Sequence, residues 1–485
     1  MPVMDANKDY QDNLQRWRIV RDCCEGEIAI KNAVATNQDN STGISGMRGS
    51  AYLPVPNASD ISPENQQRYK DYLKRANYAN YTGHTKEALL GMVFKKKPEI
   101  KLATTVKAME FDADGMGNSL SSILKRSVDE VLQVARQGLL LEYPVINVEN
   151  ATAEITDGLT PFIKSYPAET VINWRTSVIN GRQRLVLIVL KEKAEISTDE
   201  FSSEIEDQYR VLMLDSEGKY IQRVYDKSGA ALIQNEFGET DIVPKQANGK
   251  PWEFIPFVFL GAINNDPVPD ISPLYDLAVV NVAHYRNSAD FEESCFLVGQ
   301  PTVALGGLTQ HWVDEVLKGS VMLGSRAAIP LPIGGSASLL QASPNQMPME
   351  AMTHKEKQMI QIGAKIITDA GAAETAEAAR IKFAGQNSKL GTIVDNVEEA
   401  YNLLLNWSLL FTGGTGSCLV ELNKEFYDKT MDPQLLMAQI QLLDRGVIAI
   451  KDIRDRLRSN GEIKKERTDD DIDNDIADTM PFGAA

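Results

Sequence analysis

The chain has few of the residues that build metal and redox sites. It contains only four cysteines and four histidines in 485 residues. The histidines occur singly, at His84, His284, His311 and His354. The cysteines are Cys23, Cys24, Cys295 and Cys418, and an adjacent pair rarely closes a disulfide. Because no Cys/His group has the spacing of zinc ligands, we expect no metal and no cofactor. Because the cysteines do not form a disulfide framework, we expect synthesis in a reducing cytosol.

Long apolar runs are also missing. The longest are residues 185–190 and 254–262, whereas a membrane span requires roughly 18 to 20 residues. The first residues contain no apolar stretch of the kind that secretion signals carry. The sequence therefore predicts no membrane segment and no export.

Positive charge is scarce, with 50 Lys and Arg against 67 Asp and Glu and a net charge of −17. Duplex DNA is normally held by Lys and Arg that replace counterions at phosphates, so a conventional DNA-binding surface is not expected. An acidic surface is nevertheless compatible with DNA that slides past it. The basic cluster at residues 94–98 is typical of a solvated edge, and phosphate contact is its alternative.

Signatures of catalysis are absent as well. There is no G-x-x-x-x-G-K-[ST], no G-x-S-x-G and no H-E-x-x-H motif. Residues 112–117 superficially suggest a calcium loop, but the later ligands and the closing glutamate are missing, so we interpret them as a turn. We expect no enzyme, although the surplus of carboxylates leaves a metal-dependent nuclease as an alternative.

What the chain does contain is two long amphipathic helices joined by tiny residues. In residues 348–367, apolar side chains recur three or four residues apart, which aligns them on one face. The second helix runs to about residue 411, and Gly413 and Gly414 follow as a stop signal. The joint, 369–379, has no side chain that would anchor it in a core, and we interpret it as an exposed loop. The alternative is an ordinary helical hairpin with an Ala-rich turn.

The rest of the chain predicts a helix-rich α+β fold. Helices are expected at residues 10–28, 63–77, 81–93, 119–137, 272–297, 433–446 and 450–459. Strands of a mainly antiparallel sheet are expected at residues 139–141, 162–166, 170–174, 185–190, 209–214, 220–225 and 254–260. An insert of about 50 residues between two long helices should hold strands at 300–304, 321–323 and 338–341 and a helix at 309–318. A strand is expected at 418–422, and the acidic tail, 469–475, is expected to be disordered.

Several segments, in this order, resemble the portal proteins of tailed bacteriophages. They are Trp17-Arg-Ile-Val-Arg-Asp22, Tyr52-Leu-Pro54, Gly91-Met-Val-Phe-Lys-Lys-Lys-Pro98, Pro273-Leu-Tyr-Asp-Leu-Ala278, Asn281-Val-Ala-His-Tyr-Arg286, Ser288-Ala-Asp290, Gln300-Pro-Thr302 and Glu374-Thr-Ala-Glu377. The resemblance extends over more than 400 residues and is to the branch often described only as a domain of unknown function.

The resemblance implies a portal-type fold and a dodecameric ring around a DNA channel. Its parts would be an N-terminal arm and α+β wing (1–272), stem helix 1 (273–297), a clip (298–347), stem helix 2 (348–368), a tunnel loop (369–379), a long wing helix (380–416) and crown-like helices with an acidic tail (417–485). The ring would sit at one vertex of the capsid in the virion, after assembly in the host cytoplasm. Its partners would be the terminase large subunit, the head-tail adaptor, the major capsid and scaffolding proteins, and double-stranded DNA passing without sequence readout.

Three sets of residues are candidate sites under this resemblance. The tunnel loop would bring Asp369, Gly371, Glu374, Thr375 and Glu377 near DNA; alternatively, its acids cap and solubilise helix ends. The stem surface would present Lys355, Lys357 and Lys365, which instead could pair between neighbouring subunits. Clip docking would use Gln310, Trp312, Lys318 and Arg326. Another ring-forming head-tail connector is the alternative assignment.

Overall fold

The computed structural model describes residues 2–35, 46–144, 160–197, 201–233, 238–299, 302–318, 321, 329–340, 346–367, 389–426, 443, 445, 449–459, 463 and 467–479. The chain forms two compact units, Met1–Leu422 and Asn423–Ala485, which are described separately. Within the described residues, no helix is both long and apolar enough to cross a membrane.

The N-terminal region is helical, with α1 (Lys8–Glu25), α2 (Glu27–Asn32), α3 (Pro63–Arg75) and α4 (Tyr81–Val93). The helix predicted at 10–28 is confirmed as far as Glu25, but its predicted end is wrong, because the helix breaks at Gly26. Its φ of 104° suits glycine, and a Cβ there would lie 3.0 Å from the Asn80 side chain. The predicted start of α3 is confirmed: Ser62 accepts a hydrogen bond from the Asn65 amide, and Pro63 occupies the first turn.

The next segment leads from helix into sheet. It comprises β1 (Glu99–Lys101), the 3-10 helix η1 (Thr104–Glu110) and α5 (Leu120–Val134). The turn predicted at 112–117 is confirmed, and its Asp114 accepts hydrogen bonds from the Met116 and Asn118 amides. We predicted that α5 would continue to residue 137. It ends at Val134 because Ala135 adopts a left-handed conformation, with φ of 56°.

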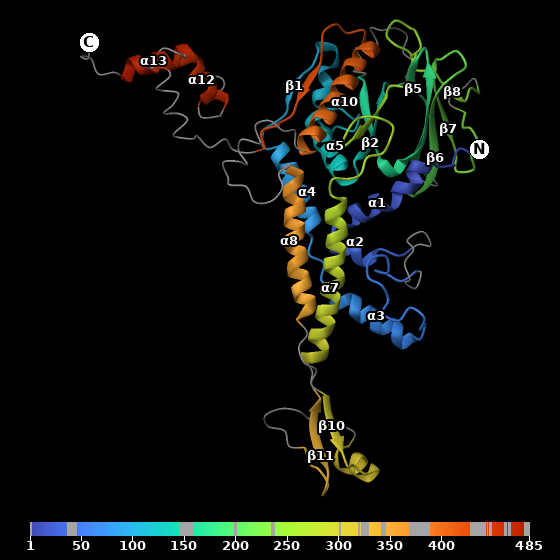
Figure 1. Ribbon diagram of the computed structural model, residues 1–485. Coiled ribbons are helices and arrows are strands. Elements are labelled where there is room, and N and C mark those ends of the chain that lie inside the picture. Colours follow the sequence, from blue (N-terminus) through green and yellow to red (C-terminus); the bar gives the residue numbers. More distant parts are fainter. Residues whose placement is uncertain are drawn as a thin grey trace. The chain divides into compact units, whose positions relative to one another are not determined.

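The two larger sheets of the described residues are both antiparallel (Figure 1). The three-stranded sheet has the order β3-β2-β9, with β2 (Arg136–Glu142), β3 (Phe162–Pro167) and β9 (Phe257–Gly261). The five-stranded sheet has the order β4 (Val171–Ile179), β5 (Arg182–Ser197), β6 (Ser203–Leu214), β7 (Tyr220–Tyr225) and β8 (Asp241–Ile242). A short helix, η2 (Ala168–Thr170), links β3 to β4. The predicted α+β class with antiparallel pairing is confirmed.

The core lies where α10 (Lys389–Thr412) packs against α5 and β9. Of the apolar positions predicted for this helix, Trp407 is half-buried and the others are buried, namely Leu390, Ile393, Val394, Val397, Tyr401, Leu404 and Leu405. At roughly 1.5–3 kcal/mol for each fully buried large apolar side chain, this face fixes the helix to the sheet. The Tyr401 hydroxyl lies 2.8 Å from the Ser127 hydroxyl of α5, so the buried phenol is hydrogen-bonded.

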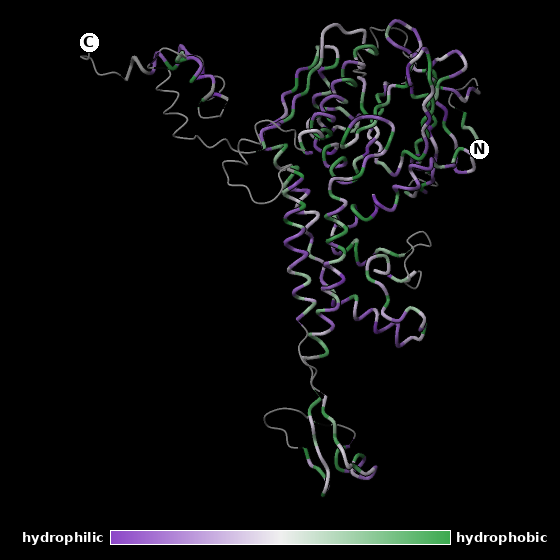
Figure 2. Tube along the Cα trace, in the orientation of Figure 1, coloured by the Kyte–Doolittle hydropathy of each residue, from purple (hydrophilic) through white to green (hydrophobic). Residues whose placement is uncertain are grey.

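The two long helices outside this core are α7 (Tyr275–Gly299) and α8 (Met347–Ile367). Between them the chain forms a hairpin of β10 (Thr302–Gly306) and β11 (Ser336–Leu340), with one π-helical turn, η3 (Trp312–Val316). Hydrophilic and hydrophobic positions alternate along both helices (Figure 2). That mixture is expected of helices with one covered and one open face.

The end of the first unit is the strand β12 (Leu419–Glu421), which pairs with β1. The second unit contains α12 (Ile450–Ser459) and α13 (Asp469–Thr479). Disorder was predicted for 469–475, and this is wrong. Thr468 and Asp471 cap each other reciprocally, and aspartates in the first turn interact favourably with the helix dipole. Ion pairs from Arg454 and Arg458 also neutralise part of the acidic charge.

Candidate functional site: an antiparallel helix pair on an α+β body

The helices α7 and α8 lie side by side and run in opposite directions (Figure 1). Their contacts fix this orientation: Lys355 donates a hydrogen bond to Asn287, and His284 Nε2 lies 3.4 Å from Glu356 Oε1. Met359 and Ile366, which belong to the predicted apolar face of α8, are buried. Residues 300–346, which include the hairpin, therefore leave and re-enter the pair at the same end.

His284 is the buried ionisable group of this helix pair. Its ring is only 2% exposed and meets the Tyr81 ring edge to face, with centroids 5.8 Å apart. Burial lowers the pKa of His284, and the neighbouring Glu356 opposes that effect only in part. No hydrogen-bond partner for His284 Nδ1 exists among the described residues. The ring is therefore neutral at pH 7, because a charge there would be poorly solvated.

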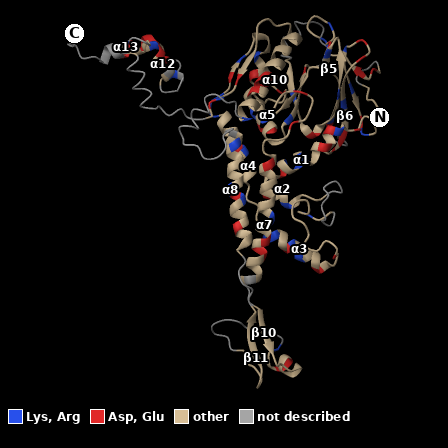
Figure 3. Cartoon of the chain, in the orientation of Figure 1, with Lys and Arg blue, Asp and Glu red and all other residues tan. Residues whose placement is uncertain are grey.

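The predicted stem lysines differ in their surroundings. Lys357 and Lys365 are exposed, whereas Lys355 is half-buried and bonded to α7. Charges of both signs occur along α7 and α8 (Figure 3). The structure thus brings only Lys355 into the helix interface and leaves the other two lysines on the surface.

Three of the predicted clip residues, Gln310, Trp312 and Lys318, lie in and around η3. Gln310 donates hydrogen bonds to Asp314, and Trp312 Nε1 donates to the Pro330 carbonyl oxygen at 3.2 Å. Lys318 is exposed and has a positive φ of 51°. The short helix predicted at 309–318 is found at residues 310–316, and η3 is its π-helical part. Arg326 lies outside the described residues.

Other predictions also fall outside the described residues. They are the five tunnel-loop residues Asp369, Gly371, Glu374, Thr375 and Glu377, the helix at 433–446 apart from two isolated positions, and most of the strand at 321–323. Two further expected strands are confirmed in β10 and β11, with bounds shifted by one or two residues.

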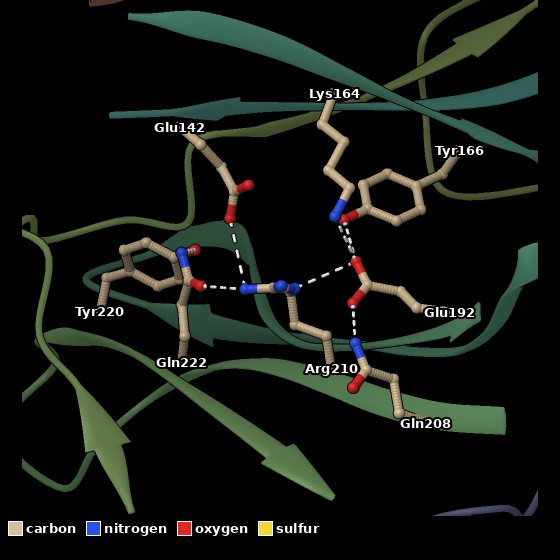
Figure 4. Close-up of polar contacts among 8 residues, drawn as sticks. All are labelled: Glu142, Lys164, Tyr166, Glu192, Gln208, Arg210, Tyr220 and Gln222. Carbon is tan, nitrogen blue, oxygen red and sulfur yellow. Dashed lines mark hydrogen bonds and ion pairs between the residues drawn. The ribbon is translucent and has the colours of Figure 1, made fainter. Parts of the chain in front are cut away.

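Sequence reasoning missed a polar cluster between the two sheets (Figure 4). Its members are Glu142, Lys164, Tyr166, Glu192, Gln208, Arg210, Tyr220 and Gln222. Glu192 Oε1 accepts hydrogen bonds from Lys164 (2.7 Å), the Tyr166 hydroxyl (2.7 Å) and Arg210 Nε (3.1 Å). Charges at inward positions of strands β5 and β6 were the signal that could have revealed the cluster.

The cluster links strands of both sheets through charged hydrogen bonds. Arg210 Nη1 bonds to Gln222 Oε1 at 3.0 Å and reaches Glu142 of β2 at 3.5 Å. Burial by itself would raise the pKa of Glu192, but Arg210, Lys164 and the Tyr166 hydroxyl outweigh it and lower the pKa to about 2. The charges of the two acids and two bases balance, which is the condition for burying them. We therefore assign the cluster a structural role.

A second unforeseen feature joins α10 to β12. Asn402 exchanges two hydrogen bonds with the backbone of Val420, at 2.6 and 3.1 Å, and Asn406 does the same with Cys418, at 3.2 Å each. One turn earlier, Glu398 accepts from the Leu422 amide. Because these residues are four apart, their side chains lie on one face of the helix. There they form the hydrogen bonds with the backbone of residues 418–422 that a neighbouring strand would otherwise form.

The described residues hold no group of three or more His, Cys, Asp or Glu side chains that could bind a metal ion. The four cysteines are all free thiols. The helix pair and its inserted hairpin are thus the most distinctive candidate for a functional element.

Comparisons with solved structures give distant likenesses. A chain described under "Neck of empty GTA particle computed with C6 symmetry" is 13% identical with a TM-score of 0.41, over 78% of this chain and 89% of that chain. A chain under "Virion of native gene transfer agent (GTA) particle" is 12% identical with a TM-score of 0.40, over 80% and 92%. At such low sequence identities and TM-scores, these similarities do not indicate the fold or the function of this chain.

No curated protein matches the sequence. A family model described as "Domain of unknown function (DUF4055)" matches residues 273–412. This range begins just before α7 and ends at the last residue of α10. The resemblance to a branch known only as a domain of unknown function is therefore confirmed over the helix pair, its insert and the long helix.

Proposed function

We propose that this chain is the portal protein of a tailed bacteriophage or a related particle. Copies would form a dodecameric ring whose channel conducts double-stranded DNA during packaging and ejection. The observation that carries the proposal is the antiparallel α7–α8 pair, with a β-hairpin inserted at one end and an α+β body at the other. A row of such pairs, packed side by side by a head-to-tail interface, would line a pore.

The roles of the other parts follow from this arrangement. The β10–β11 hairpin would dock the terminase and later the head-tail adaptor, through residues such as Gln310, Trp312, Lys318 and Arg326. The open faces of α7 and α8 carry charges of both signs, so Lys357 and Lys365 would pair with neighbouring subunits. The chain would be a passive structural protein of the virion, with packaging energy supplied by the terminase motor.

Electron microscopy of the purified full-length protein tests the proposal. Closed twelve-fold rings with a central hole are the expected particles. Monomers that persist under assembly-favouring conditions would contradict the portal role. Rings of another symmetry would favour the alternative of a different head-tail connector.

The tunnel-loop assignment has a separate test. Deleting residues 371–376 should leave rings intact but reduce packaging or retention of DNA in particles assembled with this variant. A matched control is replacement of the same six residues by a Gly/Ser segment of equal length, which should package better than the deletion if loop length matters. Failure of the deletion variant to form rings would mean that the segment is an assembly element.

A further inference from the structure

The five-stranded sheet ends in two protruding two-stranded ribbons. The basic ribbon is residues 175–184, the end of β4 and the start of β5. The acidic ribbon is residues 193–197 at the end of β5 and residues 201–207, which include the start of β6. Strand β5 is 16 residues long, so at about 3.3 Å per residue its two ends lie about 50 Å apart. The ribbons therefore do not touch each other within one copy.

Both ribbons have open strand edges. In β5, only Leu187 and the residues after it pair with β6. The start of β5 therefore has β4 as its single neighbouring strand. Beyond Leu190, β5 no longer pairs with β4, and before Tyr209, β6 does not pair with β7. Among the described residues, no strand covers these edges. Open backbone edges are templates for pairing with another chain.

The basic ribbon carries three arginines and no acid, namely Arg175, Arg182 and Arg184. Arg182 and Arg184 are two residues apart on one strand and so share a face. Arg175 and Arg182 are exposed, and none of the three side chains makes a hydrogen bond or ion pair with any other residue that the structure describes. Val178, in the same ribbon, is 72% exposed. Cationic groups and an apolar side chain are thus available at this end.

The acidic ribbon has the opposite character. Its described residues include Glu195, Glu204, Glu206 and Asp207 against a single lysine, Lys193. Lys193 pairs with Asp207 within the ribbon, and Lys227 from the turn after β7 pairs with Glu206.

Two carboxylates of the acidic ribbon form no ion pair in the described structure, although Lys227 attracts Glu204 electrostatically. Glu195 accepts a hydrogen bond from the Ser203 hydroxyl, and no ion pair is present for Glu204. Phe201 is 92% exposed and Ile205 is 69% exposed. This end therefore offers negative charge beside apolar side chains, as interaction surfaces do.

We propose that the acidic ribbon docks on the basic ribbon of a second copy of this chain. Opposite charges on the two ends favour contact of an acidic ribbon with a basic one and disfavour a two-fold contact through a single kind of ribbon, in which like charges would meet. The exposed apolar side chains and open edges would be covered in the same contact. Closure of these contacts into a ring rests on the proposed portal function, whereas the contact between two copies does not.

Charge reversal tests the contact with full-length protein at low ionic strength. Variant A is Arg182→Glu with Arg184→Glu, and variant B is Glu195→Lys with Glu204→Lys. Sedimentation velocity should show that each variant alone needs at least about tenfold more protein for half-assembly than the wild type. An equimolar mixture of A and B should recover assembly, because every contact between A and B again joins opposite charges. The chain with all four changes should recover it as well.

The matched control for variant A is Lys107→Glu with Lys125→Glu. Both lysines are exposed and lie outside the ribbons, and the change in net charge equals that of variant A. This control should assemble within about twofold of the wild type. Circular dichroism of each variant establishes that the fold is retained.

The outcomes separate this contact from the portal role. Wild-type-like assembly of A and B, no recovery in their mixture, or a wild type that stays monomeric overturns the contact. Rings formed by all variants overturn the contact but leave the portal role standing. Charge-dependent association into open oligomers without rings supports the contact and counts against the portal role.

Discussion

At the scale of single residues, the buried charges decide how the two sheets fit together. Glu192 has an 8% exposed side chain and collects donors from β3 and β6. Such a group is favourable only while its partners are present, since an uncompensated buried charge costs several kcal/mol. The cluster therefore fixes which residues of the sheets face each other, in a way that apolar contacts alone would not.

Replacing Glu192 by Gln should lower the free energy of unfolding by about 3 kcal/mol, because Lys164 and Arg210 lose their shared counter-charge. Since its folded pKa is depressed, Glu192 contributes stability that is present above the unfolded pKa of about 4.3 and lost as the pH falls toward 2. The variant should lack that part of the acid dependence. Urea unfolding at several pH values measures both effects.

The control for this substitution is Glu217→Gln, at an exposed surface pair with Lys219. It should change stability by no more than about 0.5 kcal/mol. An equal effect of the two substitutions would mean that the cluster is solvated and of little structural importance.

The pH response of His284 is a second residue-scale prediction. Because burial lowers its folded pKa, the unfolded chain binds the proton more readily, and stability should fall as the pH drops below the ordinary value of 6.5. Thermal unfolding between pH 7.5 and 5.5 should therefore show a smaller decrease in Tm for His284→Gln than for the wild type. His354→Gln, at an exposed position of α8, should respond as the wild type does.

At the scale of elements, helix α10 supports both the core and strand β12. Its apolar face was predictable from spacing. Its amide ladder, the hydrogen bonds from Asn402 and Asn406 to the backbone of β12, was not, because both residues look like ordinary solvent-facing residues in a sequence. Their role depends on a strand that follows the helix only after a turn. The pairing of β12 with β1, more than 300 residues away, completes the arrangement.

Replacing Asn402 by Ala should expose the backbone of β12 to exchange. The change leaves the Val420 amide and carbonyl without their side-chain partners, at a cost of about 1–3 kcal/mol. Hydrogen exchange should accelerate at residues 419–421. Asn248→Ala, in an exposed turn, is the control and should leave exchange in β12 unchanged.

At the scale of the whole molecule, the chain divides after Leu422. The first unit contains the two sheets, the helix pair and the core around α10. Ending the chain after Leu422 should therefore retain its fold, since the buried apolar side chains of this core lie at or before that residue. A Tm within about 3 °C of the full-length value is the expected result, and a loss of cooperative unfolding would contradict the division.

The sequence by itself determined the α+β class, most helix and strand positions, the long α7–α8 pair and the scarcity of metal-binding residues. These features depend on local spacing, caps and composition, which can be read along the chain. The break at Gly26, the end of α5 at Ala135 and the helix at 469–479 escaped prediction, since a neighbouring side chain, a left-handed residue and cross-helix ion pairs decided them. Only the tertiary structure decided the charge cluster, the amide ladder and the two ribbons of opposite charge. The charge cluster and the amide ladder require residues that are distant in sequence to be close in space. The two ribbons are separate because the long strand β5 holds them apart.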